Sequence, residues 1–194
     1  MDEVVFLLLP VLSSLFIALL AVKFDRWLGD KKDLSSILSG LGFEIVENLS
    51  IAKTITKKAE DDRKALQTMR IPFAPMPAFS DSAYLRAKNS DAFLNYVSKN
   101  KTGVAKELIR NLHECYNSIR LVNSMLESKE KVKLEIMMQR CPKEYGEQLS
   151  ATTKRTIQEA IEPILMNTLL LLEQAEPKLN KTISLLSKIP ANQN

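Results

Sequence analysis

The sequence has few of the residues on which enzyme sites and metal sites depend. It contains one histidine, two cysteines and five glycines among 194 residues. A single histidine, His113, excludes a histidine-rich zinc site and the paired Glu-x-x-His pattern of di-iron bundles. The motifs GxxxxGK(S/T), GxGxxG and GxSxG are also missing. We therefore predict that the protein is not an enzyme and has no catalytic, cofactor-binding or metal-binding residues.

The few potential ligands that exist are poorly placed for metal binding. His113, Glu114 and Cys115 are consecutive, and consecutive residues of a helix point to different faces. We expect His113 to be a surface or half-buried residue. Cys115 and Cys141 are too few for a disulfide scaffold and lack CxxC spacing. In a cytoplasmic protein both should be reduced and apolar in character, and a single bridge between them is the alternative.

Charge of one sign is not concentrated anywhere in the chain. The net charge is +4, but basic and acidic residues alternate along the sequence. A nucleic-acid-binding face would gather the basic residues in one stripe, so we predict no nucleic-acid partner. The pair Lys57 and Lys58 and the segment Lys129 to Lys133 have acids beside them and no interleaved aromatics. Both are expected to be solvated faces, or at most contacts to anionic lipid headgroups.

One long hydrophobic run is present, from Val4 to Val22. Its nineteen residues carry no charge and match the thickness of a bilayer's hydrocarbon core in helical form. The residues before it lack positive charge and it ends without an A-x-A cleavage site, which favours a retained anchor over a signal peptide. Ser14 and Ala18 are four residues apart and would allow two spans to pack closely. Lipid contact is the simpler interpretation of this pair, and a homo-oligomer is the alternative.

The flanks of this run predict its orientation. Asp2 and Glu3 precede it, whereas four basic residues follow within ten positions: Lys23, Arg26, Lys31 and Lys32. The positive-inside rule then places the body in the cytoplasm of a single-pass cell-membrane protein. We divide the chain into a transmembrane anchor (1–28), a cytoplasmic helical bundle (29–189) and a disordered tail (190–194).

A heptad pattern follows the anchor and predicts a long, coiled-coil-like helix over Leu34 to Met69. A break is expected at Gly29 and Asp30. Gly40 and Gly42 lie beside the pattern and are expected to allow close approach of another backbone. The apolar seam has spacings of three and four and two polar members, Asn48 and Asp62. We expect Asn48 to pair with a side chain of a neighbouring helix of the same chain. Its members are Leu34, Leu38, Leu41, Ile45, Asn48, Ala52, Ile55, Ala59, Asp62, Leu66 and Met69.

The remainder of the chain predicts an all-α fold. Three prolines in Arg70 to Ala78 end the first helix and give an extended segment packed on the bundle. Two short helices should follow, capped near Ser80 or Asp81 and near Ser90. Two more long helices are expected, one from Val104 to about Gln139 and one from about Ser150 to Lys188. We predict one transmembrane helix followed by an antiparallel bundle of about three long helices and one or two short ones.

Three features complete the predicted bundle. The second long helix should bury a stripe from Ala105 to Leu126, widened by Tyr116 and Leu121, and its charged segment Glu127 to Lys133 should extend past the core. Cys141, Pro142 and Gly146 should form the turn into the last helix. In the last helix the buried face should run from Ile157 to Leu186, and Pro177 should cause a kink or break.

Part of the sequence resembles a group of uncharacterised prokaryotic proteins that have one N-terminal transmembrane helix and a cytoplasmic helical body. The resemblance covers Glu44 to Leu126. It rests on three groups of residues: Glu44, Ile45 and Asn48; Phe79-Ser80-Asp81-Ser82-Ala83-Tyr84; and Tyr116, Ile119, Val122, Asn123 and Leu126. It implies a shape and no activity.

These features favour a protein-interaction or scaffolding module held at the membrane. The lipid contact is the segment Val4 to Val22, and the expected partner is another protein. The alternative is a holin-like membrane-permeabilising protein with one span and a soluble body. The size of the body and the four basic residues after the span weigh against that alternative.

Overall fold

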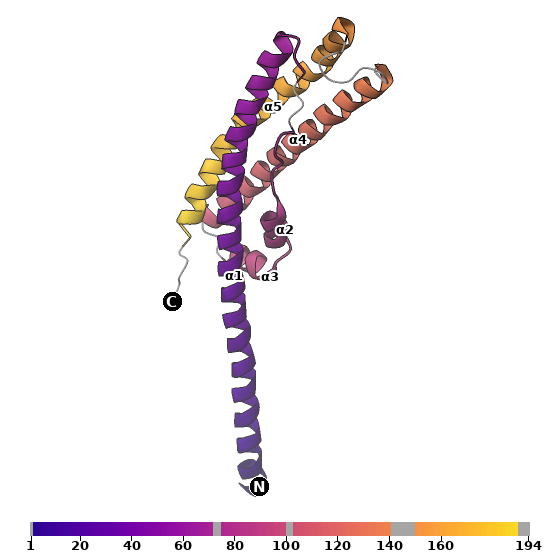
Figure 1. Ribbon diagram of the computed structural model, residues 1–194. Coiled ribbons are helices and arrows are strands. Elements are labelled where there is room, and N and C mark those ends of the chain that lie inside the picture. Colours follow the sequence, from indigo (N-terminus) through magenta and orange to yellow (C-terminus); the bar gives the residue numbers. More distant parts are fainter. Residues whose placement is uncertain (1, 72–74, 100–102, 141–149, 190–194) are drawn as a thin grey trace.

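The computed structural model is built from helices alone within the part of the chain that it describes, which is residues 2–71, 75–99, 103–140 and 150–189 (Figure 1). Side chains are described there except at residues 2–17, 27, 139 and 140. The elements are α1 (Asp2–Gln67), α2 (Ser82–Lys88), α3 (Asp91–Lys99), α4 (Gly103–Arg140) and α5 (Ala151–Ser187). The predicted all-α class is confirmed, with three long helices and two short ones.

The three long helices do not simply alternate in direction. α5 packs against both α4 and α1 and runs opposite to them (Figure 1). α1 and α4 run in the same direction, because the extended segment after α1 carries the chain back before α4 begins. The short helices α2 and α3 pack against α1, and α2 lies between α1 and α4. The expectation of an antiparallel bundle therefore holds for α5 but not for the pair α1 and α4.

The heptad seam of α1 forms the core as predicted. All seam residues from Leu41 to Ala59 are buried, and Leu66 is buried as well. Leu34 and Leu38 are half-buried, whereas Met69 lies beyond the helix end, is exposed and has a φ of 57°. The apolar spacing thus identified the correct face of the helix over about four heptads.

The break expected at Gly29 and Asp30 is wrong. α1 continues through both residues and through Pro10 as one helix of 66 residues. A single glycine weakens a helix by only about 1 kcal/mol, which the turns on either side of it can offset. The division of the chain at residue 28 therefore does not coincide with an end of secondary structure.

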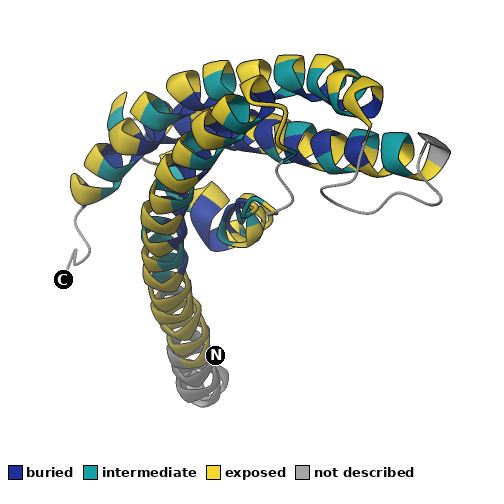
Figure 2. Cartoon of the chain, turned by 45° about the horizontal axis from the view of Figure 1, so that its top comes forward, coloured by how far each residue is buried: buried dark blue, intermediate teal, exposed yellow. Residues whose placement is uncertain are grey.

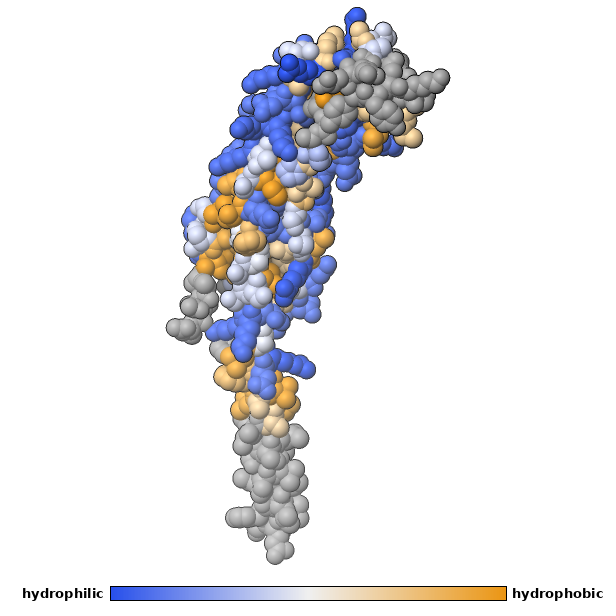
Figure 3. All heavy atoms as spheres, viewed as in Figure 1, coloured by the Kyte–Doolittle hydropathy of each residue, from blue (hydrophilic) through white to orange (hydrophobic). Residues whose placement is uncertain are grey.

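The N-terminal part of α1 projects from the bundle. Among the described side chains of α1 the first buried one is Ile37, and those before it are exposed or half-buried (Figure 2). Apolar side chains gather on this projecting part next to the residues that are not described, among them Leu19, Leu20, Val22 and Phe24 (Figure 3). Most of the predicted span Val4 to Val22, with Ser14, lies outside the described side chains. Over the described residues, no helix is both long enough and apolar enough to cross a membrane.

α4 follows its predicted stripe closely, whereas α5 follows its predicted face only in part. In α4 the stripe is buried at Ala105, Leu108, Leu112, Cys115, Ile119, Val122 and Leu126. Tyr116 is buried with it, whereas Leu121 is 51% exposed and does not widen the face. In α5 the predicted Ile164, Leu171, Ile183 and Leu186 are half-buried, and the adjacent Leu165, Leu172, Thr182 and Leu185 are buried instead. Ser150 caps the first turn of α5, and Pro163 and Pro177 both lie inside an unbroken helix. Of the kink or break expected at Pro177, the break therefore does not occur. The turn expected at Cys141, Pro142 and Gly146 lies outside the described residues.

The charged segment of α4 does not extend past the core. Lys129 and Lys133 are 1% and 4% exposed, and neither belongs to a solvated face. Val132, Ile136 and Met137 lie between or beyond them and pack on a second apolar cluster. Its buried members are Ala59, Leu66, Ile157, Ile161 and Leu165. The sequence pattern faded here because the long lysine side chains are buried along with the apolar residues.

Gly42 offers a simple way to stabilise the fold. A Cβ at Gly42 would meet nothing within 4 Å, so the close approach expected there is wrong, whereas a Cβ at Gly40 would lie 3.9 Å from Ala83 Cβ. Gly42→Ala is therefore expected to stabilise the protein by up to about 1 kcal/mol through helix propensity, or about 2–4 °C in Tm. Thermal unfolding followed by circular dichroism measures this, with Gly29→Ala as a second open position. A lower Tm for Gly42→Ala would contradict the assignment of open space.

Candidate functional site

Two asparagines hold the extended segment after α1. Asn48 of α1 donates from Nδ2 to Ser80 O (2.8 Å) and accepts from Ser80 N at Oδ1 (3.0 Å). Asn123 of α4 makes the same two bonds with Phe79: its Nδ2 donates to Phe79 O (3.1 Å), and its Oδ1 accepts from Phe79 N (3.0 Å). Each amide thus satisfies both backbone groups of one residue, as a neighbouring strand would. Asn48 pairs within its own chain as predicted, but its partner is backbone rather than a helix side chain.

Glu44 of α1 completes the attachment by capping α2. The N-cap residue Asp81 makes no side-chain capping bond. Instead, Glu44 Oε2 accepts from Ala83 N (2.7 Å) and Oε1 accepts from Tyr84 N (3.2 Å). A carboxylate at a helix N-terminus satisfies unpaired N–H groups and interacts favourably with the helix dipole. Of the two residues expected to cap α2, Asp81 makes no capping bond, and Ser80 Oγ accepts only a long bond from Ser82 N (3.5 Å). The shorter capping bonds come from a residue nearly forty positions earlier.

Side chains of three elements also converge on Glu44. Ser80 and Ser82 donate their hydroxyls to Oε2, each at 2.9 Å, and the Tyr116 hydroxyl donates to Oε1 at 2.6 Å. The Tyr116 ring stacks on Tyr84, with centroids 4.3 Å apart and an interplanar angle of 8°. We call the set Glu44, Asn48, Tyr116 and Asn123 the polar latch, because it fastens residues 79–84 between α1 and α4.

Charged and polar groups continue from the latch to the surface of α4. Arg120 Nε donates to Asp81 Oδ2 at 2.8 Å, and its guanidinium lies 5.7 Å from the centroid of the Tyr84 ring. The Tyr84 hydroxyl lies 3.2 Å from His113 Nδ1. His113 is exposed, in agreement with the sequence interpretation. No group of three or more residues of metal-binding type forms a metal site within the described part of the chain.

The latch keeps Glu44 ionised although its side chain is buried. Burial opposes ionisation, but the hydrogen bonds from Tyr116, Ala83, Ser80 and Ser82 together outweigh it and lower the pKa of the Glu44 carboxyl below its usual 4.5. Burial, together with the hydrogen bond to Glu44, raises the pKa of Tyr116. All five donors to this carboxylate come from the chain itself. The arrangement therefore holds α2 in place.

The residues that carry the sequence resemblance meet in this one place. Glu44, Asn48, Tyr116 and Asn123 form the latch around residues 79–84, and Ile119, Val122 and Leu126 are buried beside it. The capping role of Glu44 was missed by the sequence analysis. Its signal was an acid beside the apolar seam, next to Ile45.

A group of buried charges lies further along α4. Lys129 Nζ is 2.7 Å from Asp62 Oδ2 of α1 and 3.6 Å from Glu130 Oε1. Glu130 also pairs with Lys133, one turn away on the same helix. These contacts explain how two lysines are buried without leaving their charges unpaired.

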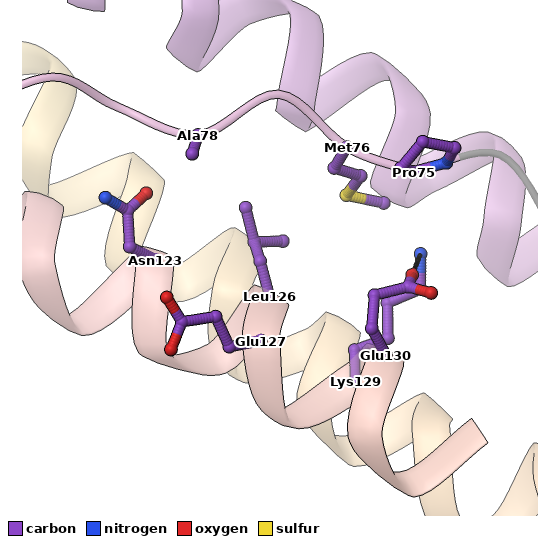
Figure 4. A pocket seen from close by; sticks show the side chains of 8 residues that line it. All are labelled: Pro75, Met76, Ala78, Asn123, Leu126, Glu127, Lys129 and Glu130. Atoms are coloured by element: carbon purple, nitrogen blue, oxygen red, sulfur yellow. Dashed lines mark ion pairs between the residues drawn. The ribbon is translucent and has the colours of Figure 1, made fainter. Parts of the chain in front are cut away.

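A groove of about 310 Å³ lies between the extended segment and α4 (Figure 4). Its lining residues are Pro75, Met76, Ala78, Asn123, Leu126, Glu127, Lys129 and Glu130. Figure 4 shows Lys129 and Glu130 rising toward Pro75, while Glu127 extends along α4. The apolar surfaces of Pro75, Met76 and Leu126, with the Glu127 carboxylate alongside, suit an apolar side chain that is adjacent to a basic one. The Glu130 carboxylate is already paired with Lys129 and Lys133.

The Cys115 thiol is expected to be unreactive toward alkylating reagents in the folded protein. It is free and buried, and burial raises the pKa of its thiol to about 12. Because the thiolate is the reactive form, iodoacetamide at pH 8 should leave Cys115 unmodified in the native state and alkylate it in denaturant. Mass spectrometry of the peptide containing Cys115 measures both states. Native modification at a rate comparable to the denatured rate would contradict its burial.

Comparisons of the chain with known proteins add no further information about function. No family model, no curated protein and no solved structure matches the chain significantly.

Proposed function

We propose that this protein is a single-pass, membrane-anchored helical module that binds another protein at the cytoplasmic side of the membrane. The proposal rests mainly on the continuity of α1. The helix that contains the predicted span Val4 to Val22 is also the helix that supplies the core seam of the bundle. The predicted span and the core seam thus lie on one continuous helix, with no break between them.

The length of α1 sets where the body stands. At 1.5 Å per residue, Ile37 lies about 22 Å along the axis from Val22, and Gln67 lies about 70 Å from it. An upright α1 would therefore hold the bundle away from the lipid surface. Lys57 and Lys58 would be about 50 Å from the end of the span, too far for contacts to headgroups of the same membrane.

The polar groups of the body favour binding over chemistry. The buried carboxylate of the latch fixes α2, its amides fix the extended segment before α2, and the buried lysines are paired with acids. The groove along α4 remains as a surface with apolar and acidic character, and a basic, apolar segment of a partner protein would complement it.

Three measurements test the proposal. A reporter fused after Asn194 should be active in the cytoplasm, and the protein should stay with membranes during alkaline carbonate extraction. Proximity labelling from the C-terminus should recover a reproducible partner, and Glu127→Lys in the groove should reduce that labelling.

Release by carbonate would refute the anchor, and an external reporter would refute the orientation. Loss of membrane potential on overexpression, without a recovered partner, would instead favour the holin-like alternative.

A further inference from the structure

α1 carries a second seam on the side opposite the core. Its members are Ser36, Ser39, Phe43, Val46 and Ser50, again spaced three and four residues apart. All five are exposed, Phe43 by 75% and Val46 by 55%. At 100° per residue these positions lie about half a turn from the buried Leu41 and Asn48. We call this set the outer seam.

The outer seam differs from an ordinary solvated helix face. Charged residues make up 26% of the chain, yet none of the five seam positions is charged. The same spacing continues to Lys32 before the seam and to Lys53 after it. The uncharged part is therefore two heptads long and is bounded at both ends by lysines, with Glu47 on its flank. Covering Phe43 and Val46, which lie one turn apart at its centre, would be favourable because it would remove exposed apolar surface from water.

We propose that the outer seam pairs in parallel with the outer seam of a second copy of this chain. This inference rests on the proposed function, because a shared membrane would hold two α1 helices upright and pointing the same way. In a parallel, in-register pair each seam residue meets its own copy, and a charge there would be repelled. The absence of charge from Ser36 to Ser50 fits that requirement. Lys32 and Lys53 would repel their copies and so limit the pairing to this stretch.

The composition of the outer seam suits such a pair. The serines at positions 36, 39 and 50 are small enough to let two helices approach closely. Phe43 and Val46 would then pack against their copies at the centre of the contact. A partner recognised by ion pairs would instead require charged groups on this face.

The length of the outer seam predicts how strong the pairing is. From Ser36 to Ser50 the helix rises about 21 Å, which cannot bury the roughly 800 Å² per partner of a standard stable interface. The pair should therefore be weak in free solution. Anchoring both copies in one bilayer raises their effective concentration and removes most of the orientational cost, so pairing should be populated there.

Disulfide cross-linking of the full chain in phosphatidylcholine vesicles tests the inference. Ser39→Cys is introduced with Cys141→Ser, and Cys115 stays because it is buried. Mild oxidation should convert most of the Ser39→Cys protein to a disulfide-linked dimer. Ser124→Cys, at an exposed serine of α4, is the matched control and should cross-link little. Adding Phe43→Glu to Ser39→Cys should lower dimer formation about tenfold, since it places two like charges in the pair.

The same samples separate the two proposals. Carbonate extraction reports whether the chain is embedded, and protection of Cys115 from alkylation reports whether each variant is folded. Release of the chain by carbonate would overturn the proposed function and this inference together. An embedded, folded chain in which Ser39→Cys links no better than Ser124→Cys would overturn the inference alone. Equal cross-linking with and without Phe43→Glu would overturn it as well.

Discussion

Glu44→Gln is expected to lower the free energy of unfolding by about 2–3 kcal/mol. The carboxylate accepts hydrogen bonds on both oxygens, three on Oε2 and two on Oε1. A glutamine of the same shape must turn its NH₂ group toward one of these sets of donors. Either way a backbone N–H of Ala83 or Tyr84 faces another donor and loses its partner, and hydrogen bonds to a charged group are among the stronger ones in proteins.

The pH dependence of this effect follows from the lowered pKa of Glu44. Because the pKa is lower in the folded state, the ionised carboxylate contributes stability that is fully present above its usual value of 4.5. This contribution is lost as the pH falls through the lowered pKa of the folded state. The difference between the wild-type protein and Glu44→Gln should therefore be largest near pH 7 and should shrink in strong acid.

Urea unfolding at pH 7 and at several acid pH values measures this difference. Glu47→Gln, at an exposed position of the same helix, is the control and should change stability by no more than about 0.5 kcal/mol. Equal stability of Glu44→Gln and Glu47→Gln at pH 7 would show that the latch contributes nothing to the fold.

Asp62→Asn is expected to lower the free energy of unfolding by about 3 kcal/mol, because it leaves the buried ammonium of Lys129 without its close partner. Lys129 is 1% exposed and lies 2.7 Å from Asp62, whereas its other acid, Glu130, is 3.6 Å away. Glu130 is itself engaged with Lys133 and cannot fully compensate. Urea or thermal unfolding should therefore show that the variant is much less stable than the wild-type protein.

Removing both charges should give a different result. The double variant Asp62→Leu with Lys129→Met replaces the ion pair by apolar groups of similar length in an apolar neighbourhood. Such replacements are often neutral or stabilising, so the double variant should recover most of the stability lost in Asp62→Asn. A double variant that is no more stable than Asp62→Asn would show that the ion pair itself, and not the unpaired charge, determines the loss.

The faces of the long helices could be read from the sequence, because burial of apolar side chains repeats with the period of the helix. Leu41, Ile45 and Ile55 in α1 and Leu108, Leu112 and Ile119 in α4 were all placed correctly. Asp62 was also placed on the buried face of α1. What spacing could not supply was its partner, since the contact with Lys129 joins residues far apart in the sequence.

The polar latch could not be predicted from spacing for the same reason, because its contacts also join residues that are far apart in the sequence. Asn48 was expected to pair within the chain, but nothing local indicates that its amide meets the backbone of Ser80. Glu44 likewise caps a helix that begins at Ser82. Local rules look for a cap within a few residues of a helix start, whereas here the fold brings the capping group from another helix. The wrong prediction of a break at Gly29 has a different origin, because one unfavourable residue does not interrupt a long cooperative helix.

The continuity of α1 makes it a lever in the proposed anchored state. Transmembrane helices tilt by about 20° on average, and a straight helix passes its tilt on to everything attached to it. With an arm of about 70 Å from Val22, such a tilt displaces Gln67 sideways by about 25 Å. A change in the tilt of the span would then displace the far end of the body most, while the residues near Ile37, on an arm of about 22 Å, would move by only about 8 Å.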